Sequence, residues 1–440
     1  MGELNATASA LAEKIRSKKA RVAVVGMGYV GLPLAVEFAK AGLTVVGVDV
    51  IKERIESLSR GESHILDIPS EELLPLVKSG KMSASLPGPV LGEVDAISIC
   101  VPTPLGKSKD PDMSFIISAT DAIAKHVRKG QVIVLESTTY PGTTEEVVRP
   151  RLEKSGLVVG KDIFLAFSPE RVDPANPKFN TRNTPKVVGG SCSNCTEVAA
   201  ALYGLAVDTV VKVSNTQTAE MVKLLENTFR AVNIGLVNEL AIICNKLGLS
   251  VWEVVAAAST KPFGFMPFWP GPGLGGHCIP VDPHYLSWKL KSLNYHARFI
   301  GLADAVNGAM PEYTVELVAE ALNHEKKAVN GSKILVLGVA YKPDVSDCRE
   351  SPAMDIVKVL SSRGGVVSYC DPFVPSFELE GTKWKASPFT AEELKKADCV
   401  VIVTHHKAFD PKLIVETAKV VVDTRNLTKG LTGPAKIRRL

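Results

Sequence analysis

The chain has 440 residues, which is too long for one ordinary domain, so two or three domains are expected. Hydrophobic residues make up 45% and charged residues 22%, as in a globular protein, and the formal net charge is only +4. No run of basic residues with interleaved aromatic residues is present, which argues against nucleic-acid binding, whereas a mild basic excess suits an anionic ligand such as a diphosphate.

The N-terminal 19 residues have the pattern of a short amphipathic helix that carries Leu11 and Ile15 and leads into a strand. We expect no signal peptide here, because no long apolar stretch follows the basic residues. The chain also lacks the roughly 18–20 uninterrupted apolar residues that span a membrane. The sequence therefore predicts a cytoplasmic protein without a membrane segment.

Residues 21–213 alternate short β-branched runs with helical segments. This alternation predicts a mostly parallel, doubly wound sheet with helices on both faces. The predicted strands are Arg21–Val25, Leu43–Asp49, Ala96–Val101, Gln131–Glu136, Ile163–Phe167 and Lys186–Val188.

Residues 214–310 contain no comparable strand, and residues 218–247 form a proline-free stretch followed by Gly248 as a C-cap. As a helix it is roughly 45 Å long. Its apolar side chains recur at helical spacing, which suits either a plain core helix or a dimerisation element. They are Met221, Leu224, Leu225, Phe229, Val232, Leu236, Leu240 and Ile243.

Residues 331–440 resume the alternation, with predicted strands at Lys333–Leu337, Gly365–Cys370, Cys399–Thr404 and Lys419–Asp423. The chain is therefore predicted to be α/β, with two α/β domains around a helical middle. We place the domains at residues 1–213, 214–330 and 331–440.

A glycine-rich turn follows the first strand. Gly26-Met27-Gly28-Tyr29-Val30-Gly31 has the spacing G-x-G-x-x-G between a strand and a helix, and the second strand ends on Asp49. In this context the motif predicts a Rossmann dinucleotide site, with the pyrophosphate at the helix N-terminus. Asp49 would accept from the adenosine ribose and repel a 2′-phosphate, so NAD is expected over NADP, although Arg54 offers a cation nearby.

The corresponding strand of the third domain ends differently, in Gly338-Val339-Ala340-Tyr341-Lys342-Pro343. With one glycine it does not form the same pyrophosphate cradle. A basic residue at the end of a degenerate Rossmann strand suits a nucleotide or sugar diphosphate, so we expect this domain to bind the substrate.

Of the eight cysteines, Cys278 has the most unusual setting. It follows four glycines and two prolines in residues 270–276, and Asp282 comes four residues later. This arrangement suits either a structural loop with a buried thiol or a reactive thiolate beside free backbone amides. His277 is a possible base or a structural loop residue. Cys192 and Cys195 form a lone C-x-x-C that we place in a loop, without the further ligands of a zinc site, so no metal is expected.

Taken in order, these and further motifs make the chain similar to the UDP-glucose/GDP-mannose dehydrogenase family over nearly its whole length. Within the family, residues 261–265 and 270–280 resemble most the UDP-N-acetylglucosamine 6-dehydrogenases. The further motifs are Val101-Pro102-Thr103-Pro104, Ser137-Thr138 with Pro141-Gly142, Ser168-Pro169-Glu170-Arg171, Lys223-Leu224-Leu225-Glu226-Asn227, Gly275-Gly276-His277-Cys278 with Asp282, Tyr341-Lys342-Pro343 and Arg349-Glu350-Ser351-Pro352.

The resemblance implies a four-electron oxidation of a sugar C6 alcohol with two NAD⁺, through a thiohemiacetal and a thioester on Cys278. Asp282 with a water is then the base or proton relay, and Lys223 and Asn227, four residues apart on the long helix, stabilise charge on the C6 oxygen. Thr138 holds a water, and Glu170 assists hydrolysis.

The resemblance also implies the ligand contacts. From the length and the apolar stripe of the long helix we expect a homodimer or larger homo-oligomer formed through it. Expected NAD contacts are the turn Gly26, Met27, Gly28, Tyr29, Val30 and Gly31, with Asp49, Arg54, Val101, Pro102, Thr103, Thr138 and Arg349. Expected contacts of a UDP-sugar are Glu170, Arg171, Lys223, Asn227, Gly273, Gly275, Tyr341, Lys342 and Arg425.

Two departures bear on the sugar. Pro174 occupies the place of a second glutamate of the UDP-glucose enzymes, and an arginine that reaches a neighbouring subunit has no match in residues 261–266, where Lys261 is the nearest substitute. Alternatives are UDP-N-acetylmannosamine, UDP-glucose or GDP-mannose as substrate, a two-electron dehydrogenase of the 6-phosphogluconate type, and a non-enzymatic NAD-binding regulator.

Overall fold

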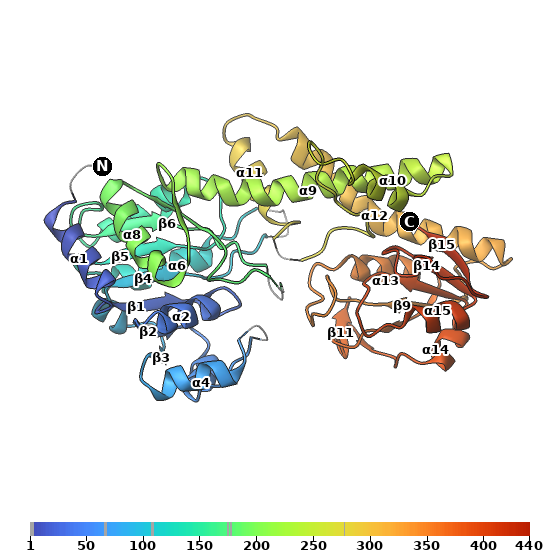
Figure 1. The fold of residues 1–440 in the computed structure, drawn as a ribbon, viewed down its shortest axis with the longest axis horizontal. Coiled ribbons are helices and arrows are strands. Elements are labelled where there is room, and N and C mark those ends of the chain that lie inside the picture. Colours follow the sequence, from blue (N-terminus) through green and yellow to red (C-terminus); the bar gives the residue numbers. More distant parts are fainter. Residues whose placement is uncertain (1–3, 66–67, 107–109, 174–175, 177, 277) are drawn as a thin grey trace. The chain divides into compact units, whose positions relative to one another are not determined.

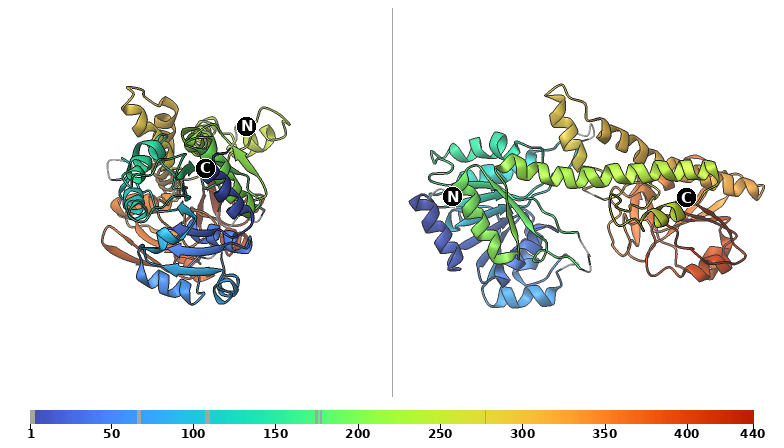
Figure 2. Two further views of the ribbon diagram at one scale, coloured as in Figure 1. Left: turned by 90° about the vertical axis from the view of Figure 1, so that its left-hand side faces the viewer. Right: turned by 45° about the horizontal axis from the view of Figure 1, so that its top comes forward.

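The computed structural model describes residues 4–65, 68–106, 110–173, 176, 178–276 and 278–440. It divides into two compact units, one of Met1–Glu226 with His284–Tyr295 and the other of Asn227–Pro283 with His296–Leu440. The helix expected over residues 218–247 is present as α9 (Thr216–Leu247), and Figures 1 and 2 show it as one unbroken helix. The three-domain division after residues 213 and 330 stays a prediction.

The first unit contains the expected doubly wound sheet, with strand order β3-β2-β1-β4-β5-β6-β7-β8. Neighbouring strands are parallel except for β6 and β7, which pair antiparallel. The order of the first six strands is that of a Rossmann fold. The strands are β1 (Arg21–Val25), β2 (Thr44–Val48), β3 (Met82–Ser85), β4 (Ala96–Ile99), β5 (Val132–Leu135), β6 (Phe164–Phe167), β7 (Lys186–Gly190) and β8 (Val210–Lys212).

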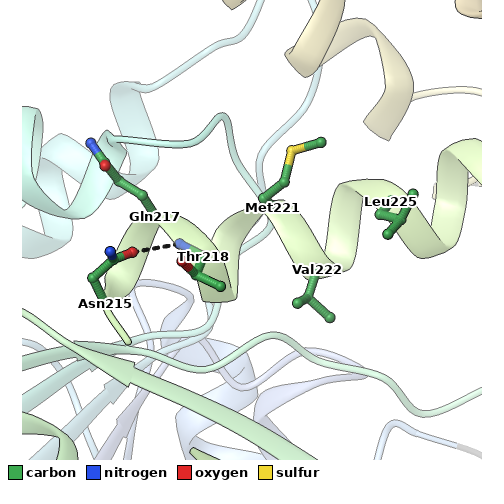
Figure 3. A pocket seen from close by; sticks show the side chains of 6 residues that line it. All are labelled: Asn215, Gln217, Thr218, Met221, Val222 and Leu225. Carbon is green, nitrogen blue, oxygen red and sulfur yellow. Dashed lines mark hydrogen bonds between the residues drawn. The ribbon is translucent and has the colours of Figure 1, made fainter. Parts of the chain in front are cut away.

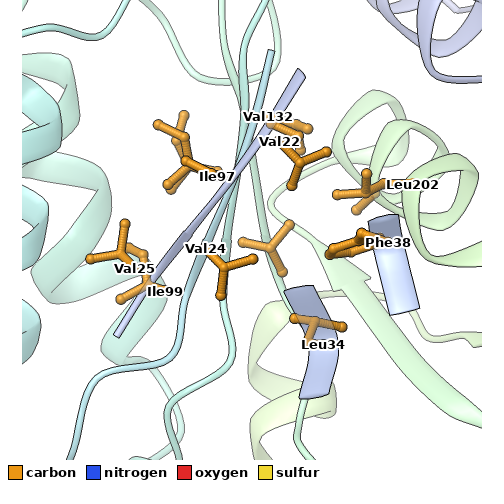
Figure 4. Close-up of a cluster of buried hydrophobic side chains, with 14 of the residues drawn as sticks. Val22, Val24, Val25, Leu34, Phe38, Ile97, Ile99, Val132 and Leu202 are labelled. Carbon is orange, nitrogen blue, oxygen red and sulfur yellow. The ribbon is translucent and has the colours of Figure 1, made fainter. Parts of the chain in front are cut away.

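Both faces of this sheet are buried, which explains its near-continuous apolar strands. On one face Val22 and Val24 of β1 pack with Leu34 and Phe38 of α2 and with Leu202 of α8 (Figure 4). The helices of this unit, besides the first part of α9, are α1 (Ala6–Arg16), α2 (Gly31–Lys40), α3 (Lys52–Ser59), α4 (Ser70–Lys78), α5 (Val90–Glu93), α6 (Ser114–Ala124), the π-helix η1 (Thr144–Val148), α7 (Arg149–Glu153), α8 (Ser193–Ala206) and most of α11 (Asp282–Lys291).

The second unit contains a parallel sheet of order β10-β9-β13-β14-β15 and a separate hairpin of β11 and β12. Ile334 and Val336 of β9 belong to the cluster that includes α12 and α13, and Leu335 and Leu337 belong to the cluster that includes α14 and α15. Its elements are β9 (Lys333–Leu337), β10 (Val366–Cys370), β11 (Ser376–Leu379), β12 (Thr382–Lys385), β13 (Cys399–Ile402), β14 (Val420–Asp423), β15 (Lys436–Arg439), α10 (Val251–Ala258), α12 (Arg298–His324), α13 (Pro352–Ser362), α14 (Ala391–Lys396) and α15 (Pro411–Thr417).

The structure confirms the predicted fold class and adds five strands that the sequence pattern missed, β3, β8, β11, β12 and β15. These strands are short, and β3 and β12 carry mostly small or polar side chains, so they lack the apolar runs that predict a buried strand.

The predicted loop around the C-x-x-C motif is wrong. Cys192 is the N-cap residue of α8, and Cys195 lies in its first turn. Ser193 and Asn194, which suggested a loop, occupy the start of this helix, where such residues are common.

No helix among the described residues is long and apolar enough to pass through a bilayer. Over the same residues, no group of three or more His, Cys, Asp or Glu side chains is arranged to hold a metal ion.

Candidate functional site

The turn after β1 has a backbone geometry that requires glycine at two positions. Gly26 has φ +94°, and a Cβ there would lie 2.6 Å from the Cys100 carbonyl oxygen that follows β4. A Cβ on Gly31 would lie 1.9 Å from the Gly26 carbonyl oxygen, whereas one on Gly28 would have no atom within 4 Å. The first and third glycines therefore allow close packing of strand and helix, and the second leaves open space before α2. This geometry fits the pyrophosphate of NAD.

Several predicted cofactor residues lie near this turn, because parallel strands place their carboxyl ends at one edge of the sheet. The Ser137 hydroxyl, after β5, donates to the Val101 carbonyl oxygen at 2.7 Å. The Tyr285 hydroxyl donates to the carbonyl oxygen of Thr103. Thr138 is half-buried and Tyr29 is exposed.

Asp49, directly after β2, is buried and held by three donors. Its carboxylate accepts from the backbone N–H groups of Met27 at 2.9 Å and Ile51 at 3.0 Å, and from the Arg54 guanidinium at 2.8 Å. Burial raises the pKa of Asp49, but the three donors together outweigh it and lower the pKa below its usual value. Asp49 is therefore an ionised, fixed acceptor, and Arg54 compensates its charge.

Glu170 lies beyond the carboxyl end of β6 and is engaged on both carboxylate oxygens. Oε1 accepts from the N–H groups of Arg171 at 2.8 Å and Val172 at 2.6 Å, and Oε2 accepts from Lys186 Nζ at 3.3 Å. Lys223 Nζ donates to the Glu170 carbonyl oxygen at 2.6 Å. Burial raises the pKa of Glu170, but Lys186, the Val172 N–H and Lys223 together lower it below its usual value.

Lys186 connects Glu170 to a buried network that the sequence analysis missed. Its ammonium group lies 2.6 Å from Glu136 Oε2, and Glu136 Oε1 accepts from the Tyr203 hydroxyl at 2.5 Å. The Tyr203 hydroxyl is also 3.3 Å from Ser98 Oγ. Burial raises the pKa of Glu136, whereas the two carboxylates outweigh burial and raise the pKa of Lys186. The only sequence signal was a lysine at the start of an apolar strand.

Arg171, an expected substrate contact, is part of an ion pair inside the first unit. Its guanidinium lies 2.6 Å from Glu226 Oε1 on α9 and donates to the Pro185 carbonyl oxygen at 2.7 Å. This pairing ties the loop after β6 to α9, one turn from Lys223 and next to Asn227.

Within the second unit, Asn227 and Asp282 meet next to Cys278. The Asn227 amide donates to Asp282 Oδ2, and its oxygen accepts from the Arg230 guanidinium. The backbone N–H of Asp282 donates to the Cys278 carbonyl oxygen at 2.8 Å, closing a turn at the start of α11. Cys278 is partly exposed, whereas Asn227 and Asp282 are buried. An amide from α9 and a carboxylate from the start of α11 are thus brought together, four residues after Cys278.

The glycine loop before Cys278 packs on the C-terminal α/β region, also within the second unit. A Cβ on Gly276 would lie 2.9 Å from the Tyr341 ring, and one on Gly275 would lie 3.0 Å from Pro352 Cδ. A Cβ on Gly271 would lie 2.4 Å from an Arg425 guanidinium nitrogen. The glycines therefore allow the loop to lie directly against Tyr341 and Arg425, two expected substrate contacts. Gly273 lies against Pro352 and Pro311.

A buried pair of asparagines fixes one end of this loop. Asn238 Oδ1 on α9 accepts from the Gly271 N–H at 2.9 Å, and Asn238 Nδ2 donates to Asn307 Oδ1 at 2.9 Å. Asn307 in turn donates to the Ala231 carbonyl oxygen at 3.1 Å. Both side chains are buried and satisfied, so the loop has a fixed anchor on two helices.

Arg425 is held by the loop after β13, because its Nε donates to the Val403 carbonyl oxygen at 2.7 Å. Burial lowers the pKa of Arg425 to about 10. Lys342 Nζ lies 5.9 Å from the centre of the Tyr341 ring. Arg349 is exposed and pairs with Asp347 at 2.7 Å; its expected contact with NAD stays a prediction.

The turn after β9 resembles the first dinucleotide turn, since an aspartate after the neighbouring strand accepts from backbone N–H groups in both. Asp371, after β10, accepts from the N–H groups of Val339 at 2.7 Å and Ala340 at 3.0 Å. His406 Nε2 lies 3.0 Å from the same carboxylate, and His406 Nδ1 accepts from the Asp344 N–H, so Nε2 carries the proton. The expectation that this turn does not form a second pyrophosphate cradle stays a prediction.

A pocket of about 350 Å³ lies along the start of α9 (Figure 3). No expected catalytic residue lines it, and its lining carries no charged group. It is lined by Asn215, Gln217, Thr218, Met221, Val222 and Leu225.

Two expected features fall outside the described residues: a chemical role for His277, and the departure at Pro174.

Three consecutive segments of the chain match the three domains of one family. Residues 20–207 match the NAD-binding domain of the UDP-glucose/GDP-mannose dehydrogenase family, residues 217–309 its central domain, and residues 335–430 its UDP-binding domain.

Individual relatives are similar to this chain over nearly its whole length. The UDP-N-acetyl-D-glucosamine 6-dehydrogenase of Pseudomonas aeruginosa is 37% identical, over 89% of this chain and 92% of its own. The UDP-N-acetyl-D-mannosamine dehydrogenase of Methanococcus maripaludis is 36% identical, over 92% of this chain and 93% of its own. The solved UDP-D-ManNAc dehydrogenase of Pyrococcus horikoshii is 33% identical, with a TM-score of 0.87 over 95% of this chain and 98% of its own.

Proposed function

The chain belongs to the UDP-glucose/GDP-mannose dehydrogenase family, and we propose that this NAD-dependent nucleotide-sugar dehydrogenase oxidises the C6 alcohol of UDP-N-acetylglucosamine to a carboxylate through a thioester on Cys278. The observation that carries the mechanism is the pairing of the Asn227 amide with the Asp282 carboxylate, one turn after Cys278 at the start of α11. Bound NAD⁺ accepts the hydride that leaves C6 in each of two oxidations.

In the first oxidation the C6 hydroxyl loses a proton while the hydride leaves. Asp282 accepts this proton through a water molecule. The Asn227 amide holds the buried Asp282 carboxylate in place for this role. The Lys223 ammonium group has three N–H donors, and one of them donates to the Glu170 carbonyl oxygen. The Asn227 amide has two N–H donors, and one of them donates to Asp282. These remaining donors stabilise the negative charge that develops on the C6 oxygen.

The Cys278 thiolate then adds to the aldehyde carbon and forms a C–S bond, and the aldehyde oxygen takes up a proton from the Asp282 relay to give a thiohemiacetal. Loss of the second hydride, together with the hydroxyl proton, converts this adduct to a thioester. Water then adds to the thioester carbon and displaces the Cys278 thiolate, which releases the carboxylate. Glu170 assists this last step as an ionised base, since its pKa is held low, and Thr138 orients the water. Covalent capture prevents loss of the aldehyde between the two oxidations.

Two relatives support an N-acetylhexosamine as the sugar, and they differ in which one they act on. UDP-N-acetylglucosamine is the first candidate, on residues 261–265 and 270–280, and UDP-N-acetylmannosamine is the second, favoured by the similarity to the Pyrococcus horikoshii structure. Arg425 and Tyr341, against the glycine loop, are the proposed contacts of the nucleotide sugar.

Stoichiometry and a substrate panel test this proposal. Purified enzyme with NAD⁺ and limiting UDP-N-acetylglucosamine is expected to yield two NADH and one uronic acid per sugar. One NADH per sugar with an accumulating aldehyde or ketone would refute the second oxidation. Faster turnover of UDP-N-acetylmannosamine or UDP-glucose at equal concentration would replace the proposed sugar and leave the mechanism standing.

We also propose that two copies pack through α9, in the cytoplasm. The helix keeps large apolar side chains exposed at Met221, Leu225, Phe229, Leu236, Ile243 and Leu247, each at least 38% accessible. A stripe of this kind on one helix is typical of a surface that packs against another chain. Sedimentation of the wild type and of Leu236→Glu tests it, and a monomeric wild type at micromolar concentration would exclude the dimer.

A further inference from the structure

Two cysteines outside the candidate active site lie side by side at the N-terminus of α8. Cys192 is the N-cap residue, and Cys195 lies in the first turn. Their Sγ atoms are 3.4 Å apart. Cys192 is partly exposed and Cys195 is buried, so a reagent from solvent meets Cys192 first.

We propose that Cys192 and Cys195 form a redox-active dithiol that reacts with small organic disulfides and closes to an intramolecular disulfide. This site is separate from Cys278 and does not depend on the proposed reaction. The proposal rests on the distance between the two sulfur atoms and on their unequal exposure.

The geometry of the pair is close to that of the oxidised form. A disulfide bond is about 2.05 Å long, so the two Sγ atoms approach by about 1.4 Å from their present 3.4 Å. Gly160 leaves the room for this thiol, because it has φ +84° and a Cβ there would lie 2.8 Å from Cys192 Sγ. Any larger residue at this position would meet the sulfur.

The surroundings favour a thiolate on Cys192 and a thiol on Cys195. The hydrogen bond between the two sulfur atoms lowers the pKa of Cys192 to about 6, with help from the N–H groups of Cys195 and Asn194 and the charge of Arg149. The same hydrogen bond, together with burial, raises the pKa of Cys195. Cys192, the more accessible of the two, is therefore the nucleophile, and the buried Cys195 is the resolving thiol.

The exchange is balanced with a disulfide as the oxidant. The Cys192 thiolate attacks one sulfur of glutathione disulfide, forms a mixed disulfide and releases one glutathione thiolate. Cys195 then gives its proton to a thiolate and attacks Cys192 Sγ, which forms the intramolecular bond and releases the second glutathione. Two protein thiols are oxidised, and one glutathione disulfide is reduced to two thiols.

The pair is also connected to the sheet. The Leu165 N–H of β6 donates to Cys195 Sγ at 3.3 Å, and Glu170 follows the same strand three residues beyond its end. Asn194 and Asn5 both donate to the Gly160 carbonyl oxygen, at 3.2 and 2.9 Å, which ties this corner to the start of α1. Oxidation therefore changes a contact of β6 directly.

Peptide mapping by mass spectrometry tests the dithiol in the full chain. After treatment with glutathione disulfide and alkylation of remaining thiols, the wild-type peptide with both cysteines is expected to lose two hydrogens and to resist alkylation. Dithiothreitol is expected to reverse this. A wild-type peptide that remains fully alkylated under conditions where Cys278 becomes glutathionylated would overturn the proposal.

Matched variants assign the two roles. Cys195→Ser is expected to stop at a glutathione adduct on Cys192, because the resolving thiol is absent. Cys192→Ser is expected to leave Cys195 unmodified, because its sulfur is buried. An adduct on Cys195 in Cys192→Ser at the wild-type rate would reverse the assignment and contradict the proposed order of attack. The wild-type result alone decides the proposal if a variant does not fold.

Discussion

Replacing Lys186 by methionine tests whether the buried network is held by charge. Lys186 is 4% exposed, and its ammonium group lies 2.6 Å from Glu136 and 3.3 Å from Glu170. Methionine keeps most of the volume but leaves the buried Glu136 carboxylate and the partly buried Glu170 carboxylate without their shared cation. Removing one partner of a buried ion pair costs about 3–5 kcal/mol, so we expect the free energy of unfolding to fall by about that amount.

Urea unfolding of the full chain, followed by circular dichroism, measures this loss. Lys212→Met is the matched control, because Lys212 forms a surface pair with Glu197 at 2.7 Å. An exposed pair contributes about 0–1 kcal/mol, so this control is expected to stay close to the wild type. The double variant Lys186→Met with Glu136→Gln removes both charges, and it is expected to recover at least about 1 kcal/mol relative to Lys186→Met.

The same substitution has a second readout in the pH dependence of stability and activity. Because the folded-state pKa of Glu170 lies below the ordinary value of 4.5, its ionised form stabilises the fold above that pH, and this stabilisation is lost as the pH falls through the folded-state pKa. Without Lys186, burial raises the pKa of Glu170, so the acid limb of the activity profile is expected to move to higher pH. A Lys186→Met protein within about 0.5 kcal/mol of the wild type, with an unmoved acid limb, would refute this account.

Four further outcomes are expected. Cys278→Ser is expected to abolish uronic acid formation while NAD binding, followed by fluorescence, persists; acid production at the wild-type rate would rule out the thioester. Asn227→Ala leaves the Asp282 carboxylate without its amide donor and is expected to lower kcat at least about tenfold, with NADH formation as the assay and unchanged kcat as the contrary result. Burial raises the pKa of Glu220 to about 7, above the unfolded value of 4.5, so wild-type stability is expected to fall by up to about 3 kcal/mol as the pH rises through this interval. Urea unfolding at about pH 5 and pH 8 measures this fall in the free energy of unfolding, and Glu220→Gln is expected to lack it. Gly271→Ala places a Cβ 2.4 Å from the Arg425 guanidinium and is expected to raise KM for the nucleotide sugar more than KM for NAD⁺; equal effects on both would argue against Arg425 as a sugar-nucleotide contact.

The sequence by itself was sufficient for the fold class, the cofactor and the family. These depend on local patterns: strand and helix periodicities differ, and the turn from Gly26 to Gly31 has steric requirements that only glycine meets at fixed spacing. The long helix was also predictable from local sequence. The spacing of its apolar residues indicates a helix, and Gly248 marks where it ends.

Only the tertiary structure showed how distant residues combine. In the sequence Lys186 is only a lysine at the start of a predicted strand. In the structure its ammonium group contacts Glu136 and Glu170, which are 50 and 16 residues away. The sequence predicted Cys192 and Cys195 in a loop, whereas the structure places them at the start of α8 with their sulfur atoms in contact. Pairing across sequence separation depends on strand order and burial, which periodicity does not encode, and burial also determines whether a charge is stabilising or costly. For this reason the resemblance of the sequence to its family implied the chemistry of Cys278, which stays a prediction. Only the structure showed that Asn227 pairs with Asp282 and that Cys192 lies against Cys195.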